Sequence, residues 1–393
     1  MIGWMTATAV AGGFAVAQQG ALAGGTGHAG LARTEDAALA WLNPAALADG
    51  EGFRGALGLA LAASRSEARQ SAGAWGVTSS SPLGLPPHLY GSVSWKRNVV
   101  GLAVHTPFAG GLRWPDDWPL ATQAVASAPT FVRIAPFVGR RMGRFRMAIG
   151  PHIDVGRLLV SRRTDHVTEL GWARIQLAGA GLGFDVATWV SVSEAVAIGV
   201  TYKSRTALAL SGWADFDVPP SVALRLPDQR ATAAWRLPDR LAVGGQVGWT
   251  QGEVGFRIVT DVEVTTWSVN RVLTFDFEDP KTPDTTQVNR WRDTLALRGG
   301  LEATVAAWTL RVGGYLDGLP DAPPPKSTLS PSSPDGLRLA ATLGAGFAPR
   351  PAVRIDGFLE WLRVLARTST APEVDAVFRT RALVTGLTVT VSP

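Results

Sequence analysis

Side chains that could carry out catalysis are few and scattered along this chain of 393 residues. No metal-ligand spacing, nucleophile elbow or phosphate-cradling glycine loop links the five histidines: His28, His88, His105, His152 and His166. Asp116-Asp117 is an adjacent acidic pair in a polar segment, a pattern typical of solvated carboxylates. We therefore expect no enzyme activity, no metal and no cofactor.

The sharpest short motif is Asn43-Pro44-Ala45, which follows a small-residue stretch (Gly27 to Arg33) and the acidic pair Glu35-Asp36. Small residues allow close packing in a confined space, and an Asn-Pro step punctuates a short helix or turn. Asn-Pro-Ala also occurs in aquaporin-type channels. Those channels are built from apolar helices, and after the first few dozen positions the chain has no uninterrupted apolar run of about 18 residues.

The elements that would position these residues are β-strands with two unlike faces. From Glu253 to Thr265, apolar and polar side chains alternate with a period of two. The apolar set is Val254, Phe256, Ile258, Val262 and Val264, and the charged set is Glu253, Arg257, Asp261 and Glu263. One such strand also fits a soluble β-sandwich, so the order of turns and loops has to decide between the two folds.

Short turns and long loops alternate along the whole chain, with long segments rich in Pro, Gly, Ser and Asp. We predict about fourteen strands, at 53–65, 88–96, 98–107, 128–141, 144–158, 172–191, 194–211, 229–249, 253–276, 291–304, 307–317, 335–348, 351–366 and 378–391. Short turns at one end and long loops at the other are the plan of an outer-membrane barrel. The predicted fold class is therefore all-β, a transmembrane antiparallel β-barrel.

Composition supports a barrel in a bacterial outer membrane. The chain carries a net charge of +5, has 18% charged residues and contains no cysteine, which fits passage through an oxidising periplasm. The positive charge forms no cluster, so we expect no nucleic-acid partner. Many tryptophans fall near predicted strand ends, where they could form two interfacial bands: Trp95, Trp189, Trp249 and Trp308 at the turn side, and Trp172, Trp213, Trp267 and Trp291 at the loop side.

The chain divides into three predicted parts. Residues 1–17 form a signal-like leader that ends in Ala15-Val16-Ala17, although no Lys or Arg precedes Arg33. Residues 18–50 form a small-residue segment, and residues 51–393 form the barrel.

In combination, the small-residue segment, the acidic pair, Asn43-Pro44-Ala45 and the strands that follow resemble the FadL-type transporters of long-chain fatty acids and hydrocarbons. Later stretches support the resemblance in the expected order: Thr106 to Gly111 followed by Trp114 and Trp118, the Leu237-Pro238 step, Trp267-Ser268 and Leu329-Ser330-Pro331. The resemblance covers essentially the whole chain after the leader.

This resemblance implies that residues 18–50 fold inside the lumen as a hatch that includes Asn43, Pro44 and Ala45. It also implies a kinked third strand that opens the wall sideways. The matching residues are His105, Pro107, Gly110 and Gly111, because Pro107 removes a ladder donor and the glycines relax the backbone. The alternative is that Pro107 merely ends the strand.

We expect a hydrophobic small-molecule substrate, most of all a long-chain fatty acid, to enter by passive diffusion. Its outer capture groove would be lined by Leu83, Leu85, Leu112, Leu120 and Trp114. The expected partners are outer-membrane lipids and lipopolysaccharide, and the expected state is a monomer. Two alternatives stay open: a porin-like channel for small polar solutes, supported by the charged inner faces, and a structural or adhesive surface barrel.

Overall fold

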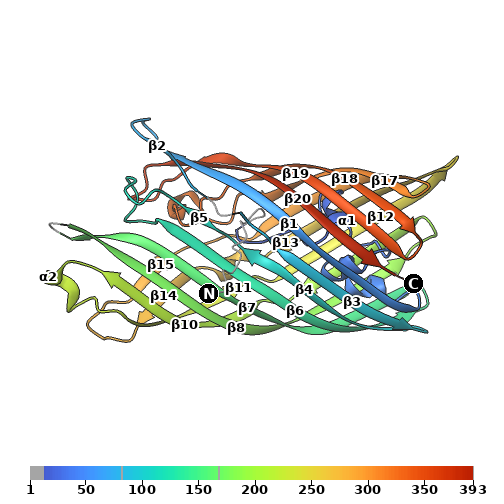
Figure 1. The fold of residues 1–393 in the computed structure, drawn as a ribbon, viewed down its shortest axis with the longest axis horizontal. Helices are drawn as coiled ribbons and strands as arrows, with labels where there is room; N and C mark the ends of the chain where they lie inside the picture. Colours follow the sequence, from blue (N-terminus) through green and yellow to red (C-terminus); the bar gives the residue numbers. More distant parts are fainter. Residues whose placement is uncertain (1–12, 81–82, 167–168, 393) are drawn as a thin grey trace.

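The chain folds into one closed antiparallel β-barrel with residues 15–48 inside (Figure 1). The structure is a computed structural model that describes residues 13–80, 83–166 and 169–392. Within these residues, fourteen strands make up the wall. The first, β1 (Gly52–Arg69), pairs with the last, β20 (Val377–Val391), along a ladder that runs from Gly55 opposite Val391 to Arg69 opposite Val377. The predicted fold class is confirmed.

Most wall strands are uninterrupted. They are β3 (Pro87–Trp95), β4 (Asn98–Ala109), β6 (Ala126–Met142), β7 (Phe145–His166), β8 (Glu169–Ser191), β16 (Thr294–Val305), β17 (Trp308–Leu319), β18 (Arg338–Arg350) and β19 (Val353–Thr368). Short turns join them at the end that holds α1 and β3, and long loops at the end that holds β2 and α2 (Figure 1). β7 and β8 reach further into the loop end than the sequence pattern predicted.

Three adjacent wall strands are interrupted at one level, where the sequence predicted continuous strands. The interrupted pairs are β9 (Val196–Lys203) with β10 (Thr206–Asp217), β11 (Gln229–Leu237) with β12 (Arg240–Gln251), and β13 (Val254–Thr265) with β14 (Val272–Phe277). Pro238 cannot donate a ladder bond. The Asp239 carboxylate accepts from the backbone N–H of Arg205 (3.0 Å) and from Thr266 Oγ1 (3.0 Å), so a side chain takes the place of a backbone acceptor at Arg205.

The remaining elements are short and lie in the lumen or the loops. They are the strands β2 (Gly76–Thr78), β5 (Leu112–Arg113) and β15 (Thr285–Val288), the helices α1 (Ala21–Gly24) and α2 (Pro220–Ala223), and the 3₁₀ turns η1 (Ala37–Trp41), η2 (Pro44–Leu47), η3 (Trp267–Val269) and η4 (Lys326–Thr328). Across the described residues, no helix has the length and apolar character needed to cross a membrane.

The two faces of the wall are as the alternation predicted. Val262 is 41% exposed on the outside, whereas Asp261 is 3% exposed and faces the lumen. The tryptophan bands were predicted only in part. Trp95, Trp213, Trp249 and Trp308 are exposed, but Trp189, Trp267 and Trp291 are buried. Those three pack inside the barrel, because Trp189 lies against hatch residues and Trp267 and Trp291 join the apolar cluster around Phe14.

The hatch lies in the lumen and is almost completely buried there. Residues 15–33 and 36–48 are all buried. Asp36 begins η1 by accepting from Ala38 N (2.8 Å), and Asn43 begins η2 by accepting from Ala45 N (3.1 Å). These are N-cap bonds, which satisfy backbone donors that a short turn leaves free. The Asn-Pro step therefore starts a turn, as its chemistry predicts.

Candidate functional site

Asn43 ties the hatch to the wall. Its Nδ2 donates to Leu31 O in the hatch and to Thr188 O in β8, each at 2.9 Å. The contact needs a glycine opposite, because a Cβ on Gly199 would lie 2.7 Å from Asn43 Nδ2 and 2.2 Å from Leu31 O. Pro44 and Ala45 are buried in η2 beside it. The structure thus places the predicted hatch motif at a wall contact, and its part in gating stays a prediction.

A hatch turn at Thr26 and Gly27 packs directly on wall backbone. Gly27 has φ +66°, a conformation that favours glycine. A Cβ at this position would lie 2.4 Å from Gly314 O in β17. Gly300 and Gly313 face Thr26 in the same way, so this turn fits against the wall without room for a methyl group.

Charged side chains of the wall hold the rest of the hatch. The Glu360 carboxylate accepts from His28 Nε2 (2.7 Å), Gln18 Nε2 (3.0 Å) and Tyr315 OH (2.7 Å). Asp261 accepts from the backbone N–H groups of Gly30 (2.7 Å) and Leu31 (3.2 Å). Because these side chains are buried, their hydrogen bonds hold the hatch more firmly than surface pairs would.

An ionic cluster lies where the hatch approaches β13 and β16. Arg33 pairs with Glu302 at 2.7 Å, and Glu35 pairs with Arg33 and Arg257. Burial would raise the pKa of the Glu35 carboxyl, but Arg33 and Arg257 outweigh it and hold that pKa well below its usual range. The neighbouring Asp36 differs, because burial and the nearby Asp356 raise its pKa. The lumenal arginines thus mostly brace the hatch and wall.

The third wall strand, β4, is irregular at the residues that the sequence singled out. Its register with β6 shifts between His105 and Phe108, so Thr106 and Pro107 form a bulge. On its other side, β3 pairs with β4 only as far as Leu89 opposite Val104. Beyond that point β4 has no neighbouring wall strand on this side among the described residues.

The N-terminal arm (Gly13–Ala17) and the hatch occupy this free edge. Val16 N donates to Pro107 O (2.9 Å), and Ala109 N donates to Phe14 O (2.8 Å), with Ala15 opposite Phe108. The Gln19 side chain serves both backbone groups of Thr106: Thr106 N donates to Gln19 Oε1 (3.2 Å) and Gln19 Nε2 donates to Thr106 O (2.6 Å). The edge of β4 is therefore completed by a segment that is not part of the wall.

The leader predicted over residues 1–17 includes this arm, and cleavage after Ala17 would remove it, so the pairing with β4 requires Gly13–Ala17 to remain on the folded chain. Residues 1–12 lie outside the described residues, and the leader itself stays a prediction. Gly13 is held by the loop before β18, because its N–H donates to Asp335 Oδ2 (2.9 Å). The other carboxylate oxygen of Asp335, Oδ1, pairs with Arg338 Nη2 (2.9 Å).

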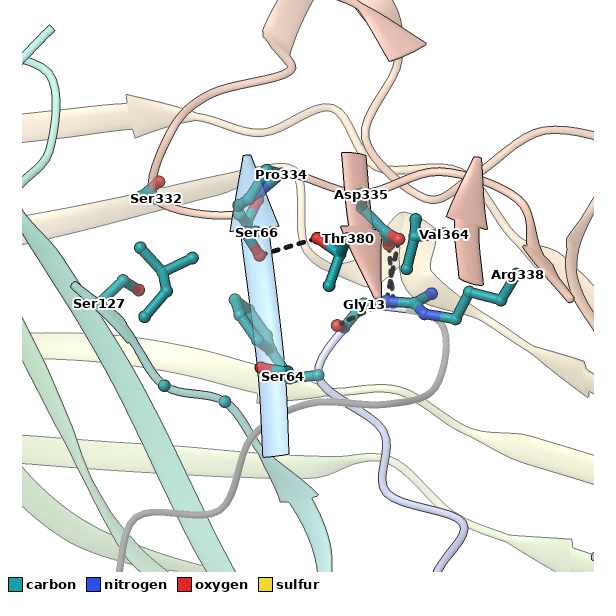
Figure 2. Close-up of a pocket in the computed structure, with 15 residues that line it drawn as sticks. Gly13, Ser64, Ser66, Ser127, Ser332, Pro334, Asp335, Arg338, Val364 and Thr380 are labelled. Atoms are coloured by element: carbon teal, nitrogen blue, oxygen red, sulfur yellow. Dashed lines mark hydrogen bonds and ion pairs between the residues drawn. The ribbon is translucent and has the colours of Figure 1, made fainter. Parts of the chain in front are cut away.

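A small cavity of about 60 Å³ lies beside the kink (Figure 2). The arm lines it with Gly13 and Phe14, and the segment after β4 lines it with Gly110, Gly111 and Leu112. Ser66 of β1 and Thr380 of β20 bond to each other at 2.7 Å at its wall (Figure 2). Two of the predicted kink residues thus border a space between the arm and the wall.

A larger cavity, about 540 Å³ in volume, opens at the loop end. Its apolar lining includes Val160, Ile175, Phe216, Phe275 and Phe277. Arg162 and Arg290 also line it, and neither has a carboxylate within ion-pairing distance in the described part of the chain. Apolar walls with a few polar groups are typical of small-molecule sites. Sequence reasoning missed this cavity, although Phe275 and Phe277 alternate with Thr274 and Asp276.

The residues predicted to line a capture groove are divided between two places. Trp114, Leu112 and Leu120 pack together in a loop cluster that shares Ala371 and Val374 with the larger cavity. Leu83 is 51% exposed beside β1, where its neighbour Gly84 pairs with Ala62, and Leu85 is half-buried in the same segment. The structure therefore does not bring these five residues together, and their role in binding stays a prediction.

Residues 162–391 match the family described as outer membrane protein transport protein (OMPP1/FadL/TodX). The chain belongs to this family. It is therefore an outer-membrane transport protein of the FadL type, in a family that carries hydrophobic compounds, and it is not an enzyme.

Solved structures of FadL-type channels share the fold. A FadL homologue of Pseudomonas aeruginosa aligns with a TM-score of 0.85 and 18% identity, covering 96% of this chain and 99% of that one. The Ralstonia pickettii toluene transporter TbuX aligns at 0.71 with 16% identity, covering 94% and 97%. The Pseudomonas putida toluene transporter TodX aligns at 0.76 with 13% identity, covering 96% and 98%. No curated protein matches the sequence.

Proposed function

We propose that the protein takes up long-chain fatty acids by passive diffusion. In this proposal the solute is captured at the loop end, the hatch gates the next step, and the solute leaves sideways through the wall at β4. A water-filled pore would serve such a solute poorly, because each CH₂ group moved into water costs about 0.8 kcal/mol. The route therefore has to offer apolar surface from entry to exit.

The larger cavity supports a solute with an apolar chain and an anionic head. Its phenylalanines offer apolar surface, and Arg162 and Arg290 offer guanidinium groups that are free to bind a carboxylate. Arginine is suited to that contact because its planar fork can donate two parallel hydrogen bonds. A neutral hydrocarbon would use the same walls without the two arginines.

The observation that carries the proposal is the pairing of the arm and hatch with β4. The bonds from Val16 and Gln19 complete an edge that the wall leaves open at Thr106 and Pro107. Movement of the arm would break these bonds without breaking any pair between two wall strands. Hatch movement and wall opening would then be one event.

An engineered disulfide tests this coupling. Ala15 and Phe108 face each other between flanking hydrogen bonds, an arrangement whose Cα atoms lie about 4.5 Å apart, within disulfide range. The chain has no native cysteine that could interfere. We expect Ala15→Cys with Phe108→Cys to abolish fatty-acid uptake when oxidised and to regain it on reduction.

The matched control is a disulfide in the closed seam, Leu57→Cys with Val389→Cys, which joins register partners on the outer face. It should leave uptake unchanged in either redox state. If the oxidised Ala15–Phe108 pair transports at the rate of the reduced form, the gate does not lie at β4. The substrate class is tested separately, by mass spectrometry of compounds that copurify with the barrel, where enrichment of fatty acids is expected.

A further inference from the structure

Three arginines lie side by side on the outer face of the barrel. Arg381 of β20 is the register partner of Arg65 in β1 and of Arg363 in β19. All three are exposed, and they share the outward parity of Leu383, which is 52% exposed. β1, β20 and β19 run next to one another in the wall (Figure 1). The three arginines therefore form a row across adjacent strands, which we call the arginine row.

Like charges directly opposite each other destabilise a sheet unless something neutralises them. The nearest carboxylate is Glu67, which binds Arg379 through Arg379 Nε (2.7 Å) and lies 3.8 Å from Arg381 Nη2. Arg65 donates to Thr78 Oγ1 at 3.3 Å. Within the described residues, neither Arg65 nor Arg363 has an ion pair. One carboxylate thus faces several guanidinium groups, and the row keeps an excess of positive charge.

The arginine row marks the upper border of the apolar band. Below it on β20, Leu383, Leu387, Val389 and Val391 are exposed, and Trp361 is 50% exposed on β19. The ten residue steps from Arg381 to Val391, at about 3.3 Å each and a tilt of about 40°, rise about 25 Å along the barrel axis. That is the height of the lipid-facing band in such barrels. The row therefore lies at the level of the outer-leaflet head groups.

We propose that the arginine row binds a phosphate group on the head of an anionic glycolipid in the outer leaflet. Guanidinium groups bind phosphate bidentately, and three in a row can share one doubly charged group. The acyl chains would lie over Leu383 and Leu387, and Trp361 would lie at the interface, as tryptophans of membrane barrels do. The site faces away from the lumen, and its binding of phosphate does not depend on the proposed substrate.

The test compares two triple variants of the full-length barrel in detergent. The first, Arg65→Gln with Arg363→Gln and Arg381→Gln, removes the row. The control, Arg97→Gln with Arg144→Gln and Arg350→Gln, removes the same charge from exposed positions at the turn end. Binding of lipid A that carries two phosphates is measured by native mass spectrometry, beside lipid A with the same acyl chains and no phosphate.

We expect the wild type and the control to bind the phosphorylated lipid about tenfold or more tightly than the phosphate-free lipid, and the row variant to lose that preference. Equal binding by the row variant and the control would overturn the proposal. So would inorganic phosphate that binds as tightly as the lipid, because the row would then be a site for a bare anion. Heat-modifiable gel migration verifies folding, and the single Arg363→Gln variant, with an expected loss of about threefold, replaces the triple variant if that one does not fold.

Discussion

The seam where β1 pairs with β20 and the edge of β4 beyond Val104 find partners for their backbone groups in different ways. At the seam, β1 and β20 pair continuously from Gly55 opposite Val391 to Arg69 opposite Val377. At β4 the wall strand β3 stops at Pro87, and the free edge pairs with the N-terminal arm and with Gln19. In lipid, every backbone group needs an internal partner, so both edges must be satisfied.

The difference lies in what must move to free the edge. Opening the seam would expose two long rows of backbone groups to lipid, at several kcal/mol for each unsatisfied group. Opening at β4 would require the release of a short arm and one glutamine side chain, while the paired wall strands keep their bonds. A barrel can therefore have one edge that is permanent and another that can be released.

Disrupting the seam between β1 and β20 should have the largest effect of all, because it should prevent folding of the barrel. Leu387 lies in β20 with partners on both sides, Leu59 and Gly357. Leu387→Pro removes a backbone donor from a ladder in the membrane-spanning wall, where each unsatisfied backbone group costs several kcal/mol. We expect no folded barrel, measured by heat-modifiable gel migration and circular dichroism, whereas Leu387→Ala should fold. Folding of the proline variant at the wild-type yield would show that the seam is no more rigid than β4, where Pro107 is native.

The β4 edge should respond to Gln19→Leu without loss of the barrel. The substitution leaves both backbone groups of Thr106 without their partner, at about 1–3 kcal/mol for each buried group. Hydrogen exchange at the amides of Val16 and Ala109 should speed up by about 30-fold or more. Gln18→Leu is the matched control, because Gln18 binds Glu360 and not β4. Unchanged exchange at these two amides would show that the Gln19 side chain does not hold the arm against the edge of β4.

A third variant separates the hatch anchor from the β4 edge. Asn43→Ala removes the cap of η2, worth about 1 kcal/mol, and two further hydrogen bonds to Leu31 O and Thr188 O. We expect faster exchange at Ala45 and unchanged exchange at Val16. Asn43→Ser, which keeps a capping oxygen, should restore part of the protection at Ala45. A rise in exchange at both places would mean that the hatch is released as one body.

The smallest expected effect is on the choice of solute that binds in the larger cavity before it reaches β4. Arg162→Gln with Arg290→Gln should weaken binding of a long-chain fatty acid by about tenfold, since charge-assisted hydrogen bonds contribute about 1.5–3 kcal/mol each before solvent screening. Binding of a neutral alkane of equal length should not change. The control is Arg113→Gln, at an exposed loop arginine that pairs with Asp116 and does not line the cavity. Equal losses for both solutes would point to a change in cavity shape.

The wall was largely predictable from the sequence because its signal is local. The alternation from Glu253 to Thr265 assigns a face to each residue, and the structure places Val262 outside and Asp261 inside. The interruption near Asp239 was missed, because alternation does not show that a carboxylate accepts the backbone N–H of Arg205 and the hydroxyl of Thr266. The Leu237-Pro238 step was the one local sign of it.

The site was less predictable because its contacts join distant parts of the chain. Asn43 was singled out by the chemistry of an Asn-Pro step, and Pro107 by the resemblance to the FadL-type family together with its missing ladder donor. Gln19 was not, because its partner Thr106 is 87 residues away and a lone glutamine carries no pattern. Leu83 was assigned to a capture groove from its apolar character alone, and the structure places it beside β1, so its role in capture stays a prediction. Apolar character does not tell which face of a loop segment a leucine occupies.

The glycine contact between Gly27 and Gly314 bears on the order of assembly. This hatch turn touches backbone of β17 so closely that one extra carbon would collide with a carbonyl oxygen. A finished barrel would have to admit the whole N-terminal segment through its mouth and then seat this turn against the wall. It is simpler for the strands to wrap around a hatch that is already in place. The hatch would then act as the template around which the later strands close.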